Sequence, residues 1–509
     1  MKIIDKFQDK INGVLSTFDR MILKGHIRQF FSNSGKMHFL SQENVLLKDF
    51  GDYAEKTTDT LKKHIEELAK KEERPLVYLH SSKISKEGTA LGILKQDPVK
   101  EGLICVVSTV ELCKSLSIKK NKDTQKLELA NNMRKCLYYY LYYIDKEFGF
   151  MHVKIQSWFP FEFQVYINGR EYLSKQLDKA GIAYKRYDNC FTEIEDIEKA
   201  QKIANDFNGR NLDNMLNHFA EQLNPFLGRI KEIFNCGYFW CLDQCEYATD
   251  IMFKSREALQ SVYKDFVEHA LLSFNCEDVM TFMGRKMHSA FSGEVVSDIK
   301  KRQQGVRIKH RMKSNSIKMY DKHSVLRVET TINDPHEFKI YKDTGKEEKV
   351  KKWVPMGKSI ANLYRYSQVS QAANKRYLDA IVLAEVRGDS VTEIEKLCTG
   401  VTSRNRSYSG FNPLSKETEK IFLGIMDGGN HINGFTNASL RKLVFQDANA
   451  DNIKIRNKTT RIIAKLRAHK LISKIPHSFK YKVTPKGIKL MSATLSVKNR
   501  FIPDAMKSA

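Results

Sequence analysis

The clearest alternation of apolar and polar positions along the chain lies in Gly305–Asn333. Successive side chains of a β-strand point to opposite faces, so a period of two predicts strands. We expect three short strands here, with Ser314-Asn315 forming the first turn. Apolar side chains such as Ile308, Met319 and Val328 fall on one face, which can pack on a core. We call this predicted three-stranded segment the basic meander, because of the residues on its other face.

The opposite face of the basic meander is strongly cationic. It carries Arg307, Lys309, Arg311, Lys313, Lys318 and Arg327, beside Tyr320 and Glu329. Such a face repels itself unless a polyanion neutralises it, so the pattern predicts contact with nucleic-acid phosphates. The plain alternative is a solvated basic face on which Glu329 forms a salt bridge.

Upstream of the basic meander, the pattern predicts a mixed sheet. Residues 1–100 read as mainly helical and polar. From Lys135 onwards we expect three strands, a helix over Glu171–Lys179, and a fourth strand that ends at Asp188-Asn189. Asp145 ends the first of these strands. This order is that of the ribonuclease H-like fold, in which the first and fourth strands lie side by side.

Carboxylates at the ends of such neighbouring strands can share divalent metals about 3.5–4 Å apart for in-line attack on a phosphodiester. Asp145 and Asp188 would supply two ligands. On a helix predicted after Trp240, Asp243, Glu246 and Asp250 share one face by their three- and four-residue spacing. The hypothesis is therefore a Mg²⁺ site formed by Asp145, Asp188 and Glu246. Asp250 would be a further ligand, and Glu329 either a ligand or an orienter of Arg327.

Each acid also has a structural interpretation. Asp145 can cap the Lys146–Gly149 turn, Asp188 can form an Asx-turn, and Asp243 can cap a helix N-terminus. A second catalytic hypothesis places His152 and Gln156 on one strand face as metal ligands.

That second hypothesis corresponds to replication initiators with a tyrosine nucleophile, which would be Tyr320 or one of the tyrosines in Tyr138–Tyr143. The spacing of four between His152 and Gln156 differs from the spacing of two that such enzymes use.

The C-terminal region has the pattern of a winged helix: three helices followed by a hairpin. We expect helices over Lys416–Met426, from Thr436 to Phe445, and over residues 458–472, with 401–412 as a linker. The third helix would bury Ile462, Ile463, Leu466 and Leu471. Its outward cations would be Lys458, Arg461, Lys465 and Arg467, and the hairpin would add Lys480 and Lys482 for contact with DNA.

Composition fits this picture. The chain has 509 residues and a net charge of +25, with a sequence pI of about 9.4. That length predicts two to four domains, and that charge favours phosphate-rich partners over small metabolites. We expect no secretory signal and no membrane span. Nine scattered cysteines without a CxxC pair predict reduced thiols in the cytoplasm.

Four sequence blocks carry a resemblance to known proteins: Asp243–Asp250, Phe282–Lys286, Arg307–Lys322 and Val325–Asn333. With the C-terminal region, they resemble a large bacterial family whose members are left as hypothetical proteins or labelled as MarR-like regulators from their last hundred or so residues. The stretch Lys318–Glu329 is also similar to strands of plasmid and phage replication initiators. Neither resemblance assigns a catalytic residue.

We therefore predict a multidomain α+β or α/β protein. Residues 1–100 would be helical, 101–400 a central α/β domain that includes the basic meander at 305–333, and 413–509 a winged helix. The predicted function is DNA processing of the mobile-element type, with Mg²⁺-dependent, transposase-like strand cleavage or transfer. The alternatives are a non-enzymatic DNA-binding regulator and a replication initiator. RNA stays an alternative partner, because a cationic surface does not distinguish RNA from DNA.

Overall fold

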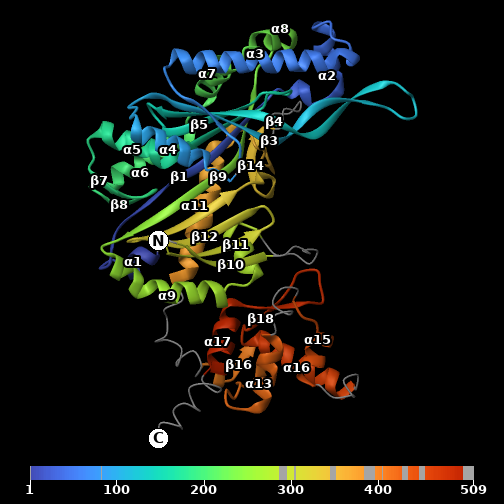
Figure 1. The fold of residues 1–509 in the computed structure, drawn as a ribbon. Coiled ribbons are helices and arrows are strands. Elements are labelled where there is room, and N and C mark those ends of the chain that lie inside the picture. The colour runs from blue at the N-terminus through green and yellow to red at the C-terminus, as the bar shows by residue number, and fades with distance from the viewer. Residues whose placement is uncertain are drawn as a thin grey trace. The chain divides into compact units, whose positions relative to one another are not determined.

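The structure is a computed structural model of a mixed α/β protein (Figure 1). It describes residues 2–81, 83–285, 295–302, 305–343, 351–382, 396–403, 405–426, 434–445 and 453–496. The chain divides into two compact units. Unit 1 comprises Met1–Ile11, Phe253–Val328 and Ala372–Ala509, and unit 2 comprises Asn12–Met252 and Glu329–Gln371.

The largest sheet among the described strands has eleven strands in the order β10-β11-β12-β13-β9-β1-β6-β5-β4-β3-β2. Their bounds are β1 Ile11–His26, β2 Leu76–Leu79, β3 Gly102–Lys120, β4 Leu127–Asp145, β5 Gly149–Gln156, β6 Phe163–Asn168, β9 Phe239–Phe253, β10 Val295–Arg302, β11 Gly305–Met312, β12 Asn315–Lys322 and β13 Val325–Ile332. The sheet is mixed, because β2 runs parallel to β3 while β3, β4, β5 and β6 pair antiparallel.

The helices of unit 2 are α2 Asn33–Gln42, α3 Phe50–Lys71, α4 Lys86–Gln96, α5 Gly169–Ala180, α6 Ile197–Asp206, α7 Asp213–Leu223 and α8 Leu227–Phe234. Figure 1 shows the long helix α3 beside α7 and α8. A hydrogen bond between His64 Nε2 on α3 and the Gln222 carbonyl oxygen on α7, at 2.8 Å, ties two of these helices together. Helix α5 begins at Asn168, whose side chain accepts from the Arg170 amide, and ends at Gly181 with φ 65°.

The N-terminal region, which we expected to be mainly helical, also contains a long strand, because β1 belongs to the largest sheet. It pairs antiparallel with β6, with Met21 opposite Ile167. Leu15, Phe18, Met21 and Leu23 on β1 are all fully buried. A strand buried on both faces reads as a mixed apolar run, so its periodicity does not stand out in the sequence.

The strand adjacency expected for a ribonuclease H-like order is not found among the described strands. The strand that ends at Asp145, β4, pairs with β3 and β5. The strand before Asp188, β7 (Tyr184–Tyr187), pairs instead with β8 (Cys190–Ile194) in a separate two-stranded sheet. Asp188 lies in the turn of this hairpin, where its φ is 51°. Short connections favour pairing of consecutive strands, and this local hairpin replaces the predicted crossover.

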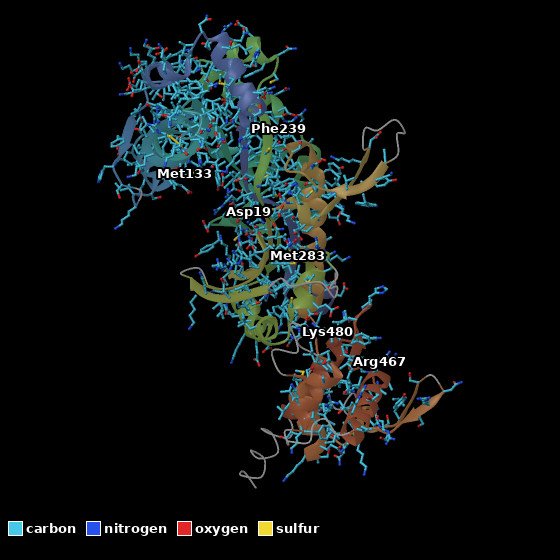
Figure 2. All side chains as sticks on the ribbon, turned by 90° about the vertical axis from the view of Figure 1, so that its right-hand side faces the viewer. Asp19, Met133, Phe239, Met283, Arg467 and Lys480 are labelled. Carbon is cyan, nitrogen blue, oxygen red and sulfur yellow. A yellow bond between two sulfur atoms is a disulfide. The ribbon has the colours of Figure 1, made fainter. Side chains whose placement is uncertain are left out.

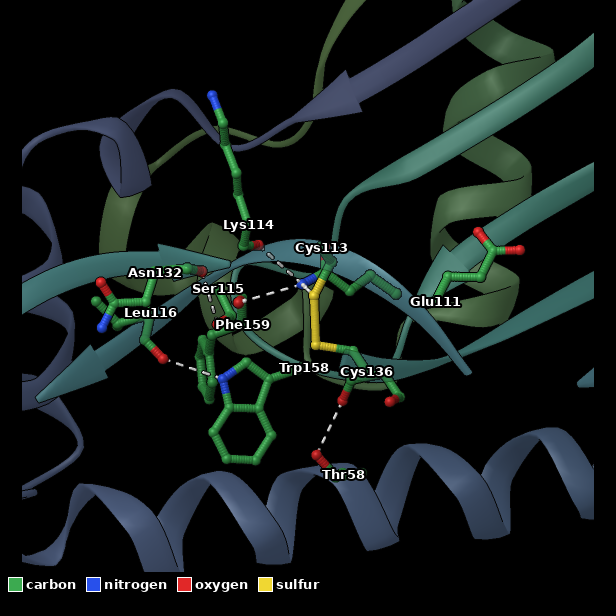
Figure 3. The surroundings of a disulfide bond; sticks show 12 residues. Thr58, Glu111, Cys113, Lys114, Ser115, Leu116, Asn132, Cys136, Trp158 and Phe159 are labelled. Carbon is green, nitrogen blue, oxygen red and sulfur yellow. Dashed lines mark hydrogen bonds between the residues drawn. A yellow bond between two sulfur atoms is a disulfide. The ribbon is translucent and has the colours of Figure 1, made fainter. Parts of the chain in front are cut away.

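A disulfide joins Cys113 on β3 to Cys136 on β4 (Figure 3). The expectation of uniformly reduced thiols is therefore wrong for this pair. Beside it, Gln156 Nε2 lies 3.3 Å from Cys113 Sγ, and Trp158 Nε1 donates to the Leu116 carbonyl oxygen at 3.1 Å. These contacts fix the middle of the long β3–β4 ribbon against the core of unit 2.

Unit 1 contains the basic meander up to Val328, and the predicted strands are confirmed as β11, β12 and β13, with β10 added at the edge. Ile308, Met312, Ile317 and Met319 are buried, as the alternation predicts. The helices α1 Lys2–Lys6, α9 Arg256–Leu272 and α10 Cys276–Phe282 belong to the same unit. Helix α11 Leu363–Ile381 contributes residues to both units.

The C-terminal part of unit 1 begins with a small hairpin, β16 Val401–Ser403 and β17 Arg406–Tyr408. It continues with α13 Lys416–Ile425, α15 Asn437–Val444, α16 Ile453–Ala468, β18 Ile472–Lys474, β19 Tyr481–Val483 and α17 Pro485–Ser496. Thr436 caps α15 as predicted, because its side chain accepts from the Ser439 amide. Ile462, Ile463, Leu466 and Leu471 pack in one core, as expected.

The segment expected to be a linker, 401–412, contributes Phe411 to that same core, together with Leu397. Residues 497–509 of the predicted winged helix, and Lys286, lie outside the described residues. No helix in the part of the chain that the structure describes is long and apolar enough to cross a membrane.

Candidate nucleic-acid interface

Four cations of the basic meander lie close together on the neighbouring strands β11 and β12. We call this set the grid: Arg307, Lys309, Arg311 and Lys318. In the antiparallel register of β11 and β12, Arg307 lies opposite Tyr320, Lys309 opposite Lys318, and Arg311 opposite Ser316. The side chains of directly opposed residues lie about 4.5–5.5 Å apart at Cβ, so Lys309 and Lys318 are close like charges. Lys313 is exposed in the turn between the strands, where its φ is 53°.

Like-charge crowding is visible in the electrostatics of Lys309. Partial burial, followed by the positive charges of Lys318 and Arg307, lowers the pKa of its ammonium group. On the neighbouring strand β10, Asp298 offsets part of this charge, since its Oδ1 lies 3.2 Å from an Arg307 guanidinium nitrogen. Around Lys309, the positive charges of Lys318, Arg307 and Arg311 therefore outnumber the negative charge of Asp298.

The third strand of the meander differs from the prediction. Every residue of β13 is buried, so Arg327 and Glu329 do not extend the open cationic face. Arg327 lies with its guanidinium carbon 5.9 Å from the centre of the Tyr320 ring. The prediction that Arg327 and Glu329 are exposed is wrong because β13 has a neighbouring strand on each side and is covered on both faces.

Helix α16 carries the second cationic surface. It begins earlier than predicted, which adds Lys454 and Arg456 to the same helix. Arg461 and Arg467 are exposed, as expected. Lys458 is also exposed and lies 2.7 Å from a Glu417 carboxylate oxygen.

Lys465 does not point outward as predicted. Its ammonium donates to the Gly410 carbonyl oxygen at 2.9 Å and lies 4.1 Å from the centre of the Phe411 ring. Burial against this segment lowers the pKa of Lys465. This contact was not expected, because residues 401–412 were predicted to be a linker.

The hairpin β18–β19 adds Lys480 and Lys482. Figure 2 shows Arg467 and Lys480 on the C-terminal elements. Lys480 is half-buried in the hairpin loop, next to Phe479, which is 88% exposed. Lys482 forms an ion pair with Glu277. Lys480 and Lys482 are the two predicted hairpin cations, and of these two only Lys482 forms an ion pair with a carboxylate among the described residues.

Two of the three predicted metal ligands lie in turns. Asp145 Oδ1 accepts from the amides of Glu147 and Phe148, each at 2.8 Å, so the turn-capping interpretation is confirmed. Asp188 lies in the β7–β8 turn described above. Its neighbour Asn189 donates from Nδ2 to Asp19 Oδ1 at 2.5 Å.

The acids expected on a helix lie instead on strand β9, so the predicted helical face is wrong. Each acid meets a cation. Asp243 lies 2.9 Å from the ammonium groups of both Lys24 and Lys358, and Glu246 lies 3.6 Å from Arg20 Nε. Burial opposes ionisation of Asp243, but its hydrogen bonds with Lys358 and Lys24 hold its pKa below the usual value.

The third acid of β9, Asp250, belongs to a buried ion cluster. Arg170 on α5 is fully buried, with Nη1 2.6 Å from Asp250 Oδ2 and Nε 3.8 Å from Asp19 Oδ2. We call Asp19, Arg170 and Asp250 the buried ion cluster. Local sequence patterns do not reveal this cluster, since only the fold brings β1, α5 and β9 together. The available signal was a charged residue inside the apolar run of β1.

The candidate residues of the replication-initiator hypothesis have different surroundings in the structure. His152 stacks on Tyr166 with ring centres 5.2 Å apart, and burial lowers its pKa to about 4. Gln156 is fully buried, and its Nε2 donates to the Lys114 carbonyl oxygen at 3.2 Å. Tyr320 lies on β12, beside the cations of the grid.

Among the described residues, no three His, Cys, Asp or Glu side chains are grouped so that they could hold one metal ion. The trio Asp145, Asp188 and Glu246 is thus not among groups of side chains that could hold one metal ion in the described residues. The candidate functional surfaces that this geometry supports are the cations on β11 and β12 and the cations on α16. No family model, curated protein or solved structure matches the chain.

Proposed function

We propose that this protein binds DNA, with the grid on β11 and β12 as a phosphate-binding surface. The observation that carries the proposal is the opposition of Lys309 and Lys318 beside Arg307 and Arg311. Holding like charges together costs stability, and a protein gains from such an arrangement when a polyanion neutralises it. Release of counterions from the DNA would supply the driving force.

We further propose that the C-terminal part is a winged helix with α16 as its recognition helix. Three helices followed by the hairpin β18–β19 support this assignment. Arg461 and Arg467 on α16 are exposed and suited to phosphates or base edges of a major groove. Lys480 would contact the backbone from the hairpin.

Strand cleavage is the part of the sequence hypothesis with the least support. It needs carboxylates that share a metal, and the described residues contain no group of three or more His, Cys, Asp or Glu side chains placed to hold one. DNA binding of the regulator type thus accounts for more of the geometry than a Mg²⁺-dependent nuclease. The transposase-like and initiator alternatives keep distinct outcomes: Mg²⁺-dependent nicking of supercoiled plasmid for the first, and a covalent adduct lost in Tyr320→Phe for the second.

The test is fluorescence anisotropy of a labelled duplex titrated with the full chain. We expect binding that weakens steeply with salt, and a several-fold loss of affinity in the double variant Lys309→Gln/Lys318→Gln. The control Lys62→Gln/Lys63→Gln removes the same charge from an exposed face of α3. Equal affinity in both double variants would overturn the role assigned to the grid.

A further inference from the structure

The hairpin formed by β14 (Lys339–Asp343) and β15 (Lys351–Pro355) carries two large exposed aromatic side chains. Tyr341 and Trp353 are 53% and 56% exposed. They lie directly opposite each other in the antiparallel register, with ring centres 5.4 Å apart. We call this hairpin the aromatic hairpin. A cross-strand pair can stabilise a hairpin, but that role does not require more than half of each ring to face solvent.

Four lysines lie on the same hairpin as the aromatic pair. Lys342 lies opposite Lys352 on the other face of the hairpin, and Lys339 and Lys351 lie at the ends of the described strands. All four lysines are exposed. Asp343, opposite Lys351, is the one carboxylate within these described strands.

The base of the aromatic hairpin is held in place. Arg365 on α11 donates from Nε to the Lys339 carbonyl oxygen at 2.8 Å, and its guanidinium carbon lies 5.2 Å from the centre of the Trp353 ring. Ile340, between Lys339 and Tyr341, is buried. The indole is therefore positioned before any ligand arrives, which lowers the entropic cost of stacking on it.

We propose that the aromatic hairpin binds single-stranded DNA, with an unpaired base stacked on Trp353 and Tyr341 and the flanking phosphates on the lysines. Exposed aromatic rings within a cationic surface suit this ligand, because every base has a stacking face and every linkage a negative charge. Duplex DNA keeps its bases stacked inside the helix and cannot use the rings in this way. The inference rests on the proposed DNA binding and adds an unpaired segment to its substrate.

Tryptophan fluorescence gives a direct readout. The chain has three tryptophans: Trp240 is buried and Trp158 half-buried, so Trp353 is the one most open to a quenching base. The full chain is titrated with oligodeoxythymidylate, oligouridylate and a mixed-sequence duplex. We expect oligodeoxythymidylate to quench the emission and to bind roughly tenfold more weakly to Trp353→Leu. Leucine keeps an apolar contact with Tyr341, so the hairpin is retained while the stacking face is lost.

Controls and outcomes separate the two proposals. Tyr341→Ala should weaken oligodeoxythymidylate binding, whereas Tyr78→Ala, at an exposed tyrosine on β2, should leave it unchanged. Duplex binding without oligodeoxythymidylate binding would overturn this inference and leave the proposed function standing. Equal affinity of Trp353→Leu and the parent chain for oligodeoxythymidylate would also overturn it. Tighter binding of oligouridylate would overturn the choice of DNA, and failure of all three ligands would overturn both proposals.

Discussion

At the scale of single residues, burial separates the charges that hold the fold from the charges a ligand can reach. Arg170 is fully buried between Asp19 and Asp250, whereas Arg461 and Arg467 are exposed on α16. A buried ion pair is weak evidence of net stabilisation, but removal of one partner leaves an uncompensated charge. The buried ion cluster should therefore respond to mutation through stability and not through DNA affinity.

Asp250→Asn tests this at the buried ion cluster. We expect the free energy of unfolding to fall by about 3 kcal/mol, because Arg170 loses its nearest carboxylate inside the core. Urea denaturation measures the change. Glu221→Gln, which breaks the exposed pair with Lys231, should leave the midpoint unchanged. Equal midpoints for the two variants would contradict a structural role for the cluster.

His152 predicts a pH dependence of stability. Burial lowers its folded-state pKa to about 4, below the unfolded value of about 6.5. Between these values the unfolded chain binds more protons, so stability falls as the pH drops from about 6.5 towards 4. From pH 7 to pH 5, His152→Phe should avoid a loss of about 1–2 kcal/mol that the parent chain suffers.

The measurement is thermal unfolding at both pH values, followed by the fluorescence of Trp158 and Trp240 in the same unit as His152. If the midpoint falls equally in the variant and in the parent chain between pH 7 and pH 5, His152 is not the cause of the pH dependence. An equal midpoint at pH 7 would show that phenylalanine fits the stack on Tyr166.

At the scale of elements, period-two alternation was sufficient to locate β11 and β12 and to assign Lys309 and Lys318 to one face. It failed for β13, where Arg327 is buried, because alternation does not reveal whether a strand is central or at an edge. Strand β9 was mistaken for a helix because acids three and four residues apart also fit a helical face. The buried ion cluster needs contacts between distant segments, which local patterns cannot supply.

The variant Lys309→Gln tests two effects of the crowded positive charges on β11 and β12, one on stability and one on DNA binding. Because burial, together with the positive charges of Lys318 and Arg307, lowers the pKa of Lys309, removal of its charge should raise the urea midpoint slightly. The same change should weaken duplex binding and make the slope of log affinity against log salt shallower by about one. A lower midpoint together with unchanged binding would indicate that the face is only structural.

Helix α16 makes a matching prediction. The double variant Arg461→Ala/Arg467→Ala should reduce duplex affinity and make the salt slope shallower by about two, since each arginine would release a counterion from the DNA. Lys62→Ala/Lys63→Ala, which removes the same charge from α3, is the control. The assignment of α16 as the recognition helix fails if the two double variants bind alike.

At the scale of the whole molecule, the chain combines two cationic surfaces with a fold in which Asp145 caps a turn and Asp243, Glu246 and Asp250 form ion pairs. Local patterns of strands and helices correctly indicated a mixed α/β protein. They could not indicate how the acids are distributed, because the partners of each acid come from other segments. Because these acids have partners within the fold, the proposed function is DNA binding.

The most direct test is the salt dependence of duplex binding by the parent chain and by a variant with Lys309, Lys318, Arg461 and Arg467 all changed to glutamine. We predict a steep decrease of log affinity with log salt for the parent chain. For the variant, we predict weaker binding and a slope shallower by about four. Absence of binding by the parent chain at low salt, or equal slopes for the two proteins, would contradict the account.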